Sequence, residues 1–251
     1  LIGERVNEAK GFANTYHDWT GKNGGLTSDP DNWSDYVYAN AGITYMSDRG
    51  PPRLSWVAHM NNPGPGNARA VADSDLAFLA LEISGSPARQ MLELGPGVNL
   101  TGRNEIRLGG KGSLMVNGGT VSSLRWIDVK AGGTLQGTGK IAAVLYNQGR
   151  VRASGLDVQS DYHQSPDASL HLAIGRKGGA PLRIRGEARL AGTLAVSLVP
   201  GLKLPPGKTI IVLSEEHIEG AFGNVGNRVV ADDGTRFKIA YAADRVTLST
   251  L

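Results

Sequence analysis

Cysteine is absent from this chain of 251 residues. Disulfide bonds, thiolate metal sites and thiol nucleophiles are therefore excluded. Long hydrophobic runs are also missing, because no stretch approaches the roughly 18 consecutive apolar residues of a membrane-spanning helix, and no signal peptide is visible. We expect no insertion into a membrane. Because the chain opens on Leu1 and not on methionine, we expect a processed protein or part of a longer polypeptide.

An excess of charge of one sign is lacking too. The chain has 26 lysines and arginines against 23 aspartates and glutamates, which leaves a net charge of only +3. A nucleic-acid-binding domain usually carries a stronger and more clustered basic excess, so we expect no nucleic-acid partner. Phosphate-binding loops, dinucleotide fingerprints, zinc-ligand spacings and the G-x-S-x-G nucleophile elbow are likewise missing.

Glycine and short β-type segments dominate what is present. The chain holds 35 glycines, yet 40% of its residues are hydrophobic, which indicates a turn-rich folded protein and not a disordered one. Between residues 92 and 158, segments such as 105–108, 113–116 and 127–130 largely alternate apolar with polar residues and stop at glycine pairs. Such strands recur roughly every 10 to 20 residues without a convincing helix between them. The pattern predicts an all-β, right-handed parallel β-helix, or β-solenoid.

The alternation also predicts the core of the repeat, because successive side chains of a strand point to opposite faces. The apolar positions of these segments should form a continuous stack of inward side chains. They are Ile106, Leu114, Val116, Ile127, Val129, Leu135 and Ile141.

Three regions follow one another along the chain. Residues 1–66 hold three of the four tryptophans and several loop-forming runs, which indicates an irregular aromatic-rich cap over the open end of the solenoid. In this cap a weak helix is possible at 4–12, and Trp19 and Trp33 are expected in its core. Residues 67–160 form the repeat, where 68–84 could be helix or strand but lead into strands. Residues 161–251 predict a β-rich end, either sandwich-like or built of wider coils.

Several segments resemble the passengers of autotransporters and related bacterial surface β-helix repeats. The matching stretches run in the same order as in that family; they are 18–21, 28–35, 132–141, 147–155, 161–174, 182–198 and 220–225. The resemblance covers about residues 16–251. It implies a secreted or surface-located bacterial right-handed β-helix of the kind appended to carbohydrate-active enzymes or adhesins. It implies no catalytic residues.

Two kinds of side chain are candidates for ligand contact. Arginines flank or separate aliphatic residues in several strands, so they should face outward where the aliphatic residues face inward; they are Arg107, Arg150, Arg152, Arg183 and Arg185. They form either an ordinary solvated face or a stripe for an anionic polysaccharide. Among the aromatics, Trp126 should point outward beside Ile127, and Trp56 lies in a loop-flanked stretch where core and ligand contact are about equally supported.

The sequence gives less support to a metal site or to catalysis. Asp29, Asp31 and Asp35 are spaced as calcium ligands could be, although an ordinary loop with Asx turns explains them better, and we expect no cofactor. A polysaccharide lyase would need a cation and a proton acceptor, for which Tyr162, His163 and Arg152 (or Arg150) are the candidates. No pair of carboxylates suits glycoside hydrolysis.

We therefore expect a non-catalytic module of a secreted or surface bacterial protein that binds polysaccharide or acts as a spacer. A small β-helix lyase or glycoside hydrolase acting on acidic polysaccharide is one alternative. A structural adhesin segment with a protein partner is the other. Carboxylates and bases converging on one groove would favour the enzyme, and exposed aromatics along a groove would favour sugar binding.

Overall fold

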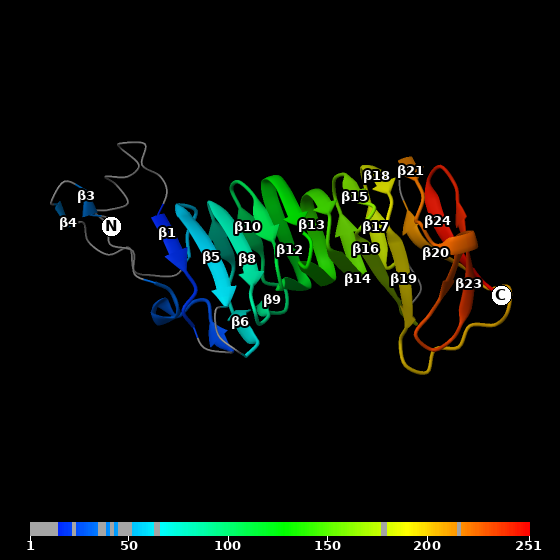
Figure 1. The fold of residues 1–251 in the computed structure, drawn as a ribbon, viewed down its shortest axis with the longest axis horizontal. Helices are drawn as coiled ribbons and strands as arrows, with labels where there is room; N and C mark the ends of the chain where they lie inside the picture. Colours follow the sequence, from blue (N-terminus) through cyan, green and yellow to red (C-terminus); the bar gives the residue numbers. More distant parts are fainter. Residues whose placement is uncertain are drawn as a thin grey trace.

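The protein is an elongated β-solenoid whose chain advances from the N-terminal end to the C-terminal end of the rod (Figure 1). The computed structural model describes residues 15–21, 24–34, 39–40, 43–44, 52–62, 66–176, 180–214 and 217–251. The solenoid has about six turns. Each full coil contributes strand segments to three parallel ladders, which we call faces A, B and C. The prediction of an all-β parallel solenoid is confirmed.

Face A carries the groove described below. Its strands pair in parallel in the order β2 (Gly25–Leu26), β6 (Ala68–Ala72), β9 (Gln90–Leu94), the first parts of β12 (Gly112–Val129), β13 (Thr134–Asn147) and β14 (Arg150–Val158), β16 (Ser169–Ile174) and β19 (Thr193–Leu198). The long strands β12 and β13 continue around the corners of the coil, so that their later parts belong to the other faces.

Faces B and C complete the coil. Face B consists of β7 (Leu76–Phe78), β10 (Leu100–Gly102), the middle parts of β12 and β13, the end of β14, β17 (Leu182–Ile184) and β20 (Thr209–Ser214). Face C consists of β1 (Thr15–Asp18), β5 (Trp56–Asn62), β8 (Ala80–Gly85), β11 (Ile106–Leu108), the ends of β12 and β13, β15 (Tyr162–Gln164), β18 (Glu187–Leu190) and β21 (His217–Gly220).

The interior is filled by stacked aliphatic side chains. On face A, the register places Leu92, Leu114, Leu135, Val151 and Leu170 one above another, and all five are fully buried. Burial of each such side chain contributes about 1.5–3 kcal/mol. All seven core positions expected from the alternation are buried, which confirms the inward register. Residues 68–84 form strands β6 to β8 and not a helix.

The described part of the N-terminal cap is packed around tryptophans. Trp33 meets Trp19 and Trp56 edge to face, with ring centroids 5.1 and 5.6 Å apart. Its Nε1 donates a hydrogen bond to the carbonyl of Thr27, at 3.0 Å. The 3-10 helix η1 (Pro30–Asn32) and the short antiparallel pair β3 (Ala39–Asn40) and β4 (Ile43–Thr44) also lie in this region. The core role of Trp19 and Trp33 is confirmed, whereas the helix considered for residues 4–12 lies outside the described residues.

A small antiparallel sheet follows the last coil, and we call it the end sheet. Its strands pair in the order β20, β24 (Arg245–Thr250), β23 (Arg236–Tyr241) and β22 (Arg228–Val230), with the 3-10 helix η2 (Val225–Asn227) before β22. Strand β20 also pairs in parallel with β17, so the end sheet continues face B. The β-rich C-terminal end therefore combines parallel coils, which continue through β21, with this sheet.

Candidate functional site

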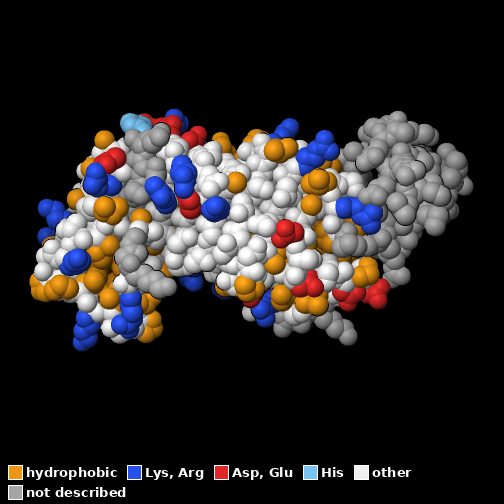
Figure 2. All heavy atoms as spheres, turned by 180° about the vertical axis from the view of Figure 1, so that it is seen from behind, with side chains coloured by type: hydrophobic (Ala, Val, Ile, Leu, Met, Phe, Trp, Pro, Cys, Tyr) orange, Lys and Arg blue, Asp and Glu red, His pale blue; other side chains and the backbone are white. Residues whose placement is uncertain are grey.

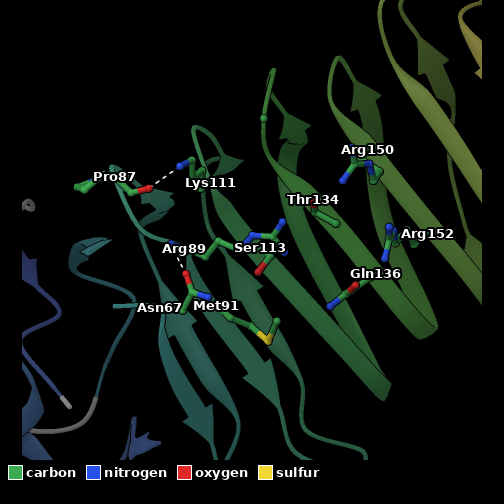
Figure 3. A pocket seen from close by; sticks show the side chains of 11 residues that line it. Asn67, Pro87, Arg89, Met91, Lys111, Ser113, Thr134, Gln136, Arg150 and Arg152 are labelled. Carbon is green, nitrogen blue, oxygen red and sulfur yellow. Dashed lines mark hydrogen bonds between the residues drawn. The ribbon is translucent and has the colours of Figure 1, made fainter. Parts of the chain in front are cut away.

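A basic groove lies on face A across strands β9, β12, β13 and β14 (Figure 3). Its cavity has a volume of about 300 Å³. Four cationic side chains line it, namely Arg89, Lys111, Arg150 and Arg152. The polar uncharged side chains in its lining are Asn67, Ser113, Thr134 and Gln136, and the lining contains no aspartate or glutamate.

The strand register produces this arrangement. Ser113, Thr134 and Arg150 are partners on successive coils, and Gln136 and Arg152 are partners two positions further along. Since side chains alternate along a strand, the residues between these positions point into the core. Thr134, Gln136 and the two arginines point outward, whereas Ser113 lines the groove but is itself buried. Adjacent coils are about 4.8 Å apart, so the groove residues form regularly spaced rows along the rod.

Gly132 lines the groove at the turn before β13. Its φ is +81°, in the left-handed region that favours glycine. A Cβ atom at this position would lie 2.1 Å from the carbonyl oxygen of Gly110. Any other residue would therefore require a backbone shift in the groove lining.

A second cavity of about 270 Å³ continues the groove toward β16 and β19. Gln136 and Arg152 line both cavities, and the second one adds His171 and Ser197. The ring Nε2 of His171 lies 2.9 Å from the hydroxyl of Ser197. Burial lowers the pKa of His171, and the positive charge of Arg152 lowers it further, so the ring is neutral at neutral pH.

The groove cations differ in how the protein holds them. Lys111 donates from Nζ to the carbonyl oxygen of Pro87 at 2.5 Å, which fixes its position at the rim. Within the part of the chain that the structure describes, no carboxylate lies within 4.0 Å of Arg150 or Arg152. Both arginines are exposed on β14. They are therefore available to an anionic ligand.

The other three predicted arginines do not join this groove. Arg107 lies on face C, where its guanidinium contacts Glu105 at 3.0 Å and Glu82 at 3.9 Å. Arg183 is on β17 of face B, and Arg185 follows that strand and donates to both oxygens of Asp157 at 3.1 and 2.9 Å. The expectation of a single stripe of five arginines was wrong, because these arginines are distributed over three faces of the coil and only Arg150 and Arg152 lie on face A.

The two predicted tryptophans have different surroundings. Trp56 is fully buried and stacks on His17 with ring centroids 3.6 Å apart, so it cannot present its ring to a ligand at the surface. It belongs to the core of the cap. Trp126 is half-buried beside the inward Ile127, and the guanidinium of Arg125 lies 5.5 Å from its ring centroid. Its outward position is confirmed, but it lies next to face C and not in the groove.

The three residues considered for a lyase do not converge. Tyr162 points into the core, where its hydroxyl donates to Gln164 at 2.5 Å and accepts from Asn147 at 3.0 Å. Burial raises the pKa of this hydroxyl. His163 is on face C and stacks on Tyr146 with ring centroids 5.0 Å apart, whereas Arg152 is on face A. These three residues, which only the lyase alternative would use, therefore form no common site.

The acidic loop near the N-terminus acts as a cap for the 3-10 helix η1. The carboxylate of Asp29 accepts a hydrogen bond from the backbone N–H of Asp31 at 3.0 Å, as in an Asx turn. Asp35 lies outside the described residues. Among the residues that are described, no cluster of three or more histidine, cysteine, aspartate or glutamate side chains could hold a metal ion.

Sequence reasoning missed Arg89, Lys111, Gln136 and His171. The first two lie in turns, where period-two alternation does not apply. One signal could have found them, because Arg89 and Lys111 immediately precede residues that are register partners, Gln90 and Gly112. Aligning the coils with one another before assigning outward positions would have placed the two cations side by side.

Comparison of the chain with known protein families, with curated proteins and with solved structures finds no match. The fold therefore defines the class, a parallel β-solenoid, and the site has to be interpreted from its own chemistry. No helix in the described ranges has the length and apolar character needed to cross a membrane.

Proposed function

We propose that the protein is a non-catalytic module that binds an anionic polysaccharide along the groove of face A. The observation that carries this proposal is the lining of the groove, which holds four cations and no carboxylate. A cationic lining that contains no carboxylate favours an anionic ligand, and a groove along a rod suits a chain-like one.

The chemistry of the lining matches such a ligand. Arginine guanidinium groups bind carboxylate and sulfate groups through two parallel hydrogen bonds, which makes Arg150 and Arg152 suitable anion anchors. Ser113, Thr134 and Gln136 lie between these arginines and the Arg89 and Lys111 pair. Their hydroxyl and amide groups can exchange hydrogen bonds with the hydroxyl groups of sugar rings.

The resemblance to bacterial surface β-helices supports a secreted or surface location for this module. A polysaccharide-binding rod suits a secreted or surface-located bacterial protein, in which it would hold a neighbouring domain on its substrate or hold a cell on a matrix. A spacer needs the same rigid rod but no cationic groove. Binding is what separates the two roles.

Affinity electrophoresis through gels containing alginate, pectin or dextran sulfate tests the proposal. We expect retardation that weakens with salt, because salt screens exposed charges beyond about 10 Å at 0.1 M ionic strength. The double variant Arg150→Gln, Arg152→Gln should bind at least about tenfold more weakly, since it loses two charge-assisted contacts. Arg183→Gln on face B is the matched control and should bind like the unchanged protein. Unchanged mobility in every gel at low salt would leave the spacer role.

One observation favours a second candidate function, β-elimination. Arg152 and His171 are register partners that line the same cavity, and the lowered pKa keeps the imidazole neutral and able to accept a proton. In this reaction His171 would take the proton next to a uronate carboxylate neutralised by Arg152. The electrons form a carbon–carbon double bond while the glycosidic C–O bond breaks, and the leaving oxygen takes a proton from water. Unsaturated products that absorb in the ultraviolet, and that disappear in His171→Ala, would establish this activity; their absence supports binding alone.

A further inference from the structure

The outer face of the end sheet carries cations that the described protein does not neutralise. The four strands of this sheet contain Arg228, Arg236, Lys238 and Arg245 but no aspartate or glutamate. Arg245 pairs with Asp244, whereas no carboxylate among the described residues lies within 4.0 Å of the other three cations. At the C-terminal end of the face seen in Figure 2, lysine and arginine side chains lie among hydrophobic ones.

The register brings two of these cations directly opposite each other. Arg228 of β22 is the partner of Lys238 of β23, and both side chains are exposed. Lys238 is in turn the partner of Ser249, which is the partner of Thr209. These four residues form a row across the sheet, which we call the end-sheet row. The hydroxyl groups of Thr209 and Ser249 lie 2.9 Å apart.

Like charges opposite each other on one face of an antiparallel sheet destabilise it. The pairing of Arg228 with Lys238 in the end-sheet row therefore does not help to stabilise the sheet. The nearest acidic residues along the chain, Asp232 and Asp233, lie in the turn between β22 and β23. Asp233 accepts a hydrogen bond from the backbone N–H of Thr235. The negative charge of Asp232 raises the pKa of His171, which opposes part of the lowering by burial and Arg152.

We propose that the end-sheet row is a second binding site, which takes the sulfate or phosphate ester group of an acidic polysaccharide. A tetrahedral oxyanion bridges the guanidinium of Arg228 and the ammonium of Lys238, and it accepts a further hydrogen bond from the hydroxyl of Ser249. Three acceptor oxygens suit this set of donors better than the two of a carboxylate. Bound anion removes the repulsion between the two cations. This proposal stands on a different sheet from the groove and does not depend on it.

The variant Lys238→Glu separates binding from folding. It replaces a repulsive pair with an attractive one between Arg228 and the new carboxylate, so the melting temperature should stay the same or rise. It also places a negative charge in the proposed site, so the affinity for dextran sulfate should fall by about tenfold. Lys203→Glu is the matched control, because it makes the same charge change at an exposed position outside the end sheet.

The affinities of the full chain and these variants would be measured by isothermal titration calorimetry. The ligands would be dextran sulfate, polygalacturonate and inorganic sulfate, and Arg228→Gln and the groove double variant would be included. We expect Lys238→Glu and Arg228→Gln to weaken binding of dextran sulfate and to leave binding of polygalacturonate unchanged. Saturable heat with inorganic sulfate that is lost in both variants would show that the oxyanion itself is recognised.

The outcomes distinguish this site from the groove. If the groove double variant abolishes all binding while Lys238→Glu binds dextran sulfate normally, the end-sheet site is wrong and the groove stands. If only the end-sheet variants lose binding, the groove proposal fails and this one stands. Equal losses in Lys203→Glu and Lys238→Glu would show a mere dependence on net charge and would overturn the site. Binding of polyglutamate as tight as that of dextran sulfate would overturn the assignment to a polysaccharide ester.

Discussion

The groove of face A and the surface of face C are built from the same coils but differ in how their charged residues are paired. On face C, charged residues meet partners of opposite sign, as in the pairs Arg107 with Glu82, at 3.9 Å, and Arg189 with Glu219, at 3.3 Å. On face A, Arg150 and Arg152 follow a row of uncharged serine, threonine and glutamine side chains. The scaffold is the same in both cases. The residue placed at one register position therefore decides whether an outward cation has a carboxylate beside it.

The pairs on face C contribute little to stability. Both partners in each pair are substantially exposed, and exposed ion pairs contribute about 0–1 kcal/mol. Their more useful effect is to remove net charge from that surface. Face A has a pair of this kind between Arg69 and Glu93, at 2.6 Å, but its groove has none. Arg150 and Arg152 therefore stay available, and the comparison predicts that anionic ligands select the groove.

The largest expected effect comes from the core that both faces share. Ile127→Asp should destabilise the protein by several kcal/mol, about 4 or more, because it buries an unpaired carboxylate in the aliphatic stack. Urea unfolding followed by circular dichroism measures the change. Arg125→Asp, two positions away on the same strand and exposed, should unfold like the unchanged protein. A normal midpoint for Ile127→Asp would disprove the inward register.

The next largest effect should come from making face A resemble face C. Gln136→Glu places a carboxylate beside Arg152, its register partner on the next coil. We expect binding of anionic polysaccharide to weaken about tenfold, because the new carboxylate pairs with Arg152 and competes with the ligand for it. The melting temperature should stay unchanged. Gln159→Glu, exposed and outside the groove, has the same charge change and should bind normally. Equal binding by all three proteins would show that Arg152 is not an anchor.

A smaller effect is expected from the titration of His171. Its pKa is lowered in the folded protein, so the unfolded chain, whose histidines titrate near about 6.5, binds this proton more tightly. Stability should therefore be fully retained above that pH and fall as the pH drops below it. Urea unfolding between pH 7.5 and 5 should give a flatter pH dependence for His171→Gln than for the exposed control His217→Gln. Identical slopes for both variants would contradict the assignment.

The smallest effect should come from breaking an ion pair on face C. Glu82→Gln removes the longer of the two contacts of Arg107 and leaves Glu105 at 3.0 Å. The free energy of unfolding should change by less than about 0.5 kcal/mol, and polysaccharide binding should not increase. New retardation in an alginate gel would show that pairing on face C is what keeps ligands away from it.

The sequence predicted the inside of the rod better than its outside. Whether Ile127 or Val151 points inward depends only on alternation within a strand, which is a local property. Which outward residues meet depends on where each coil turns its corners. Ser113 and its partner Thr134 are 21 positions apart, whereas Thr134 and Arg150 are only 16 apart. Arg107 and Arg150 both lie beside inward aliphatic residues in their strands. Because the coils differ in length, the two arginines still lie on different faces.

The candidate site was accordingly predicted only in part. Arg150 and Arg152 were expected at the surface and line the groove, but their partners Arg89 and Lys111 lie in turns, where no periodicity marks the outward side. Trp56 was ambiguous because its surroundings are set by Trp33 and His17, which are distant in sequence. Such contacts follow from tertiary packing and not from the local pattern.

The regular rise of the coils gives the groove a repeat of its own, and the proposed polysaccharide ligand has another. A polymer whose repeat differs from about 4.8 Å loses alignment with the coils a little more at each step. The cations of the groove lie at its two ends, and Ser113 and Thr134 separate them with uncharged side chains. A ligand therefore has to match the coil repeat only at these two points. We therefore expect the groove to accept polymers of different repeat length, provided that anionic groups reach both ends.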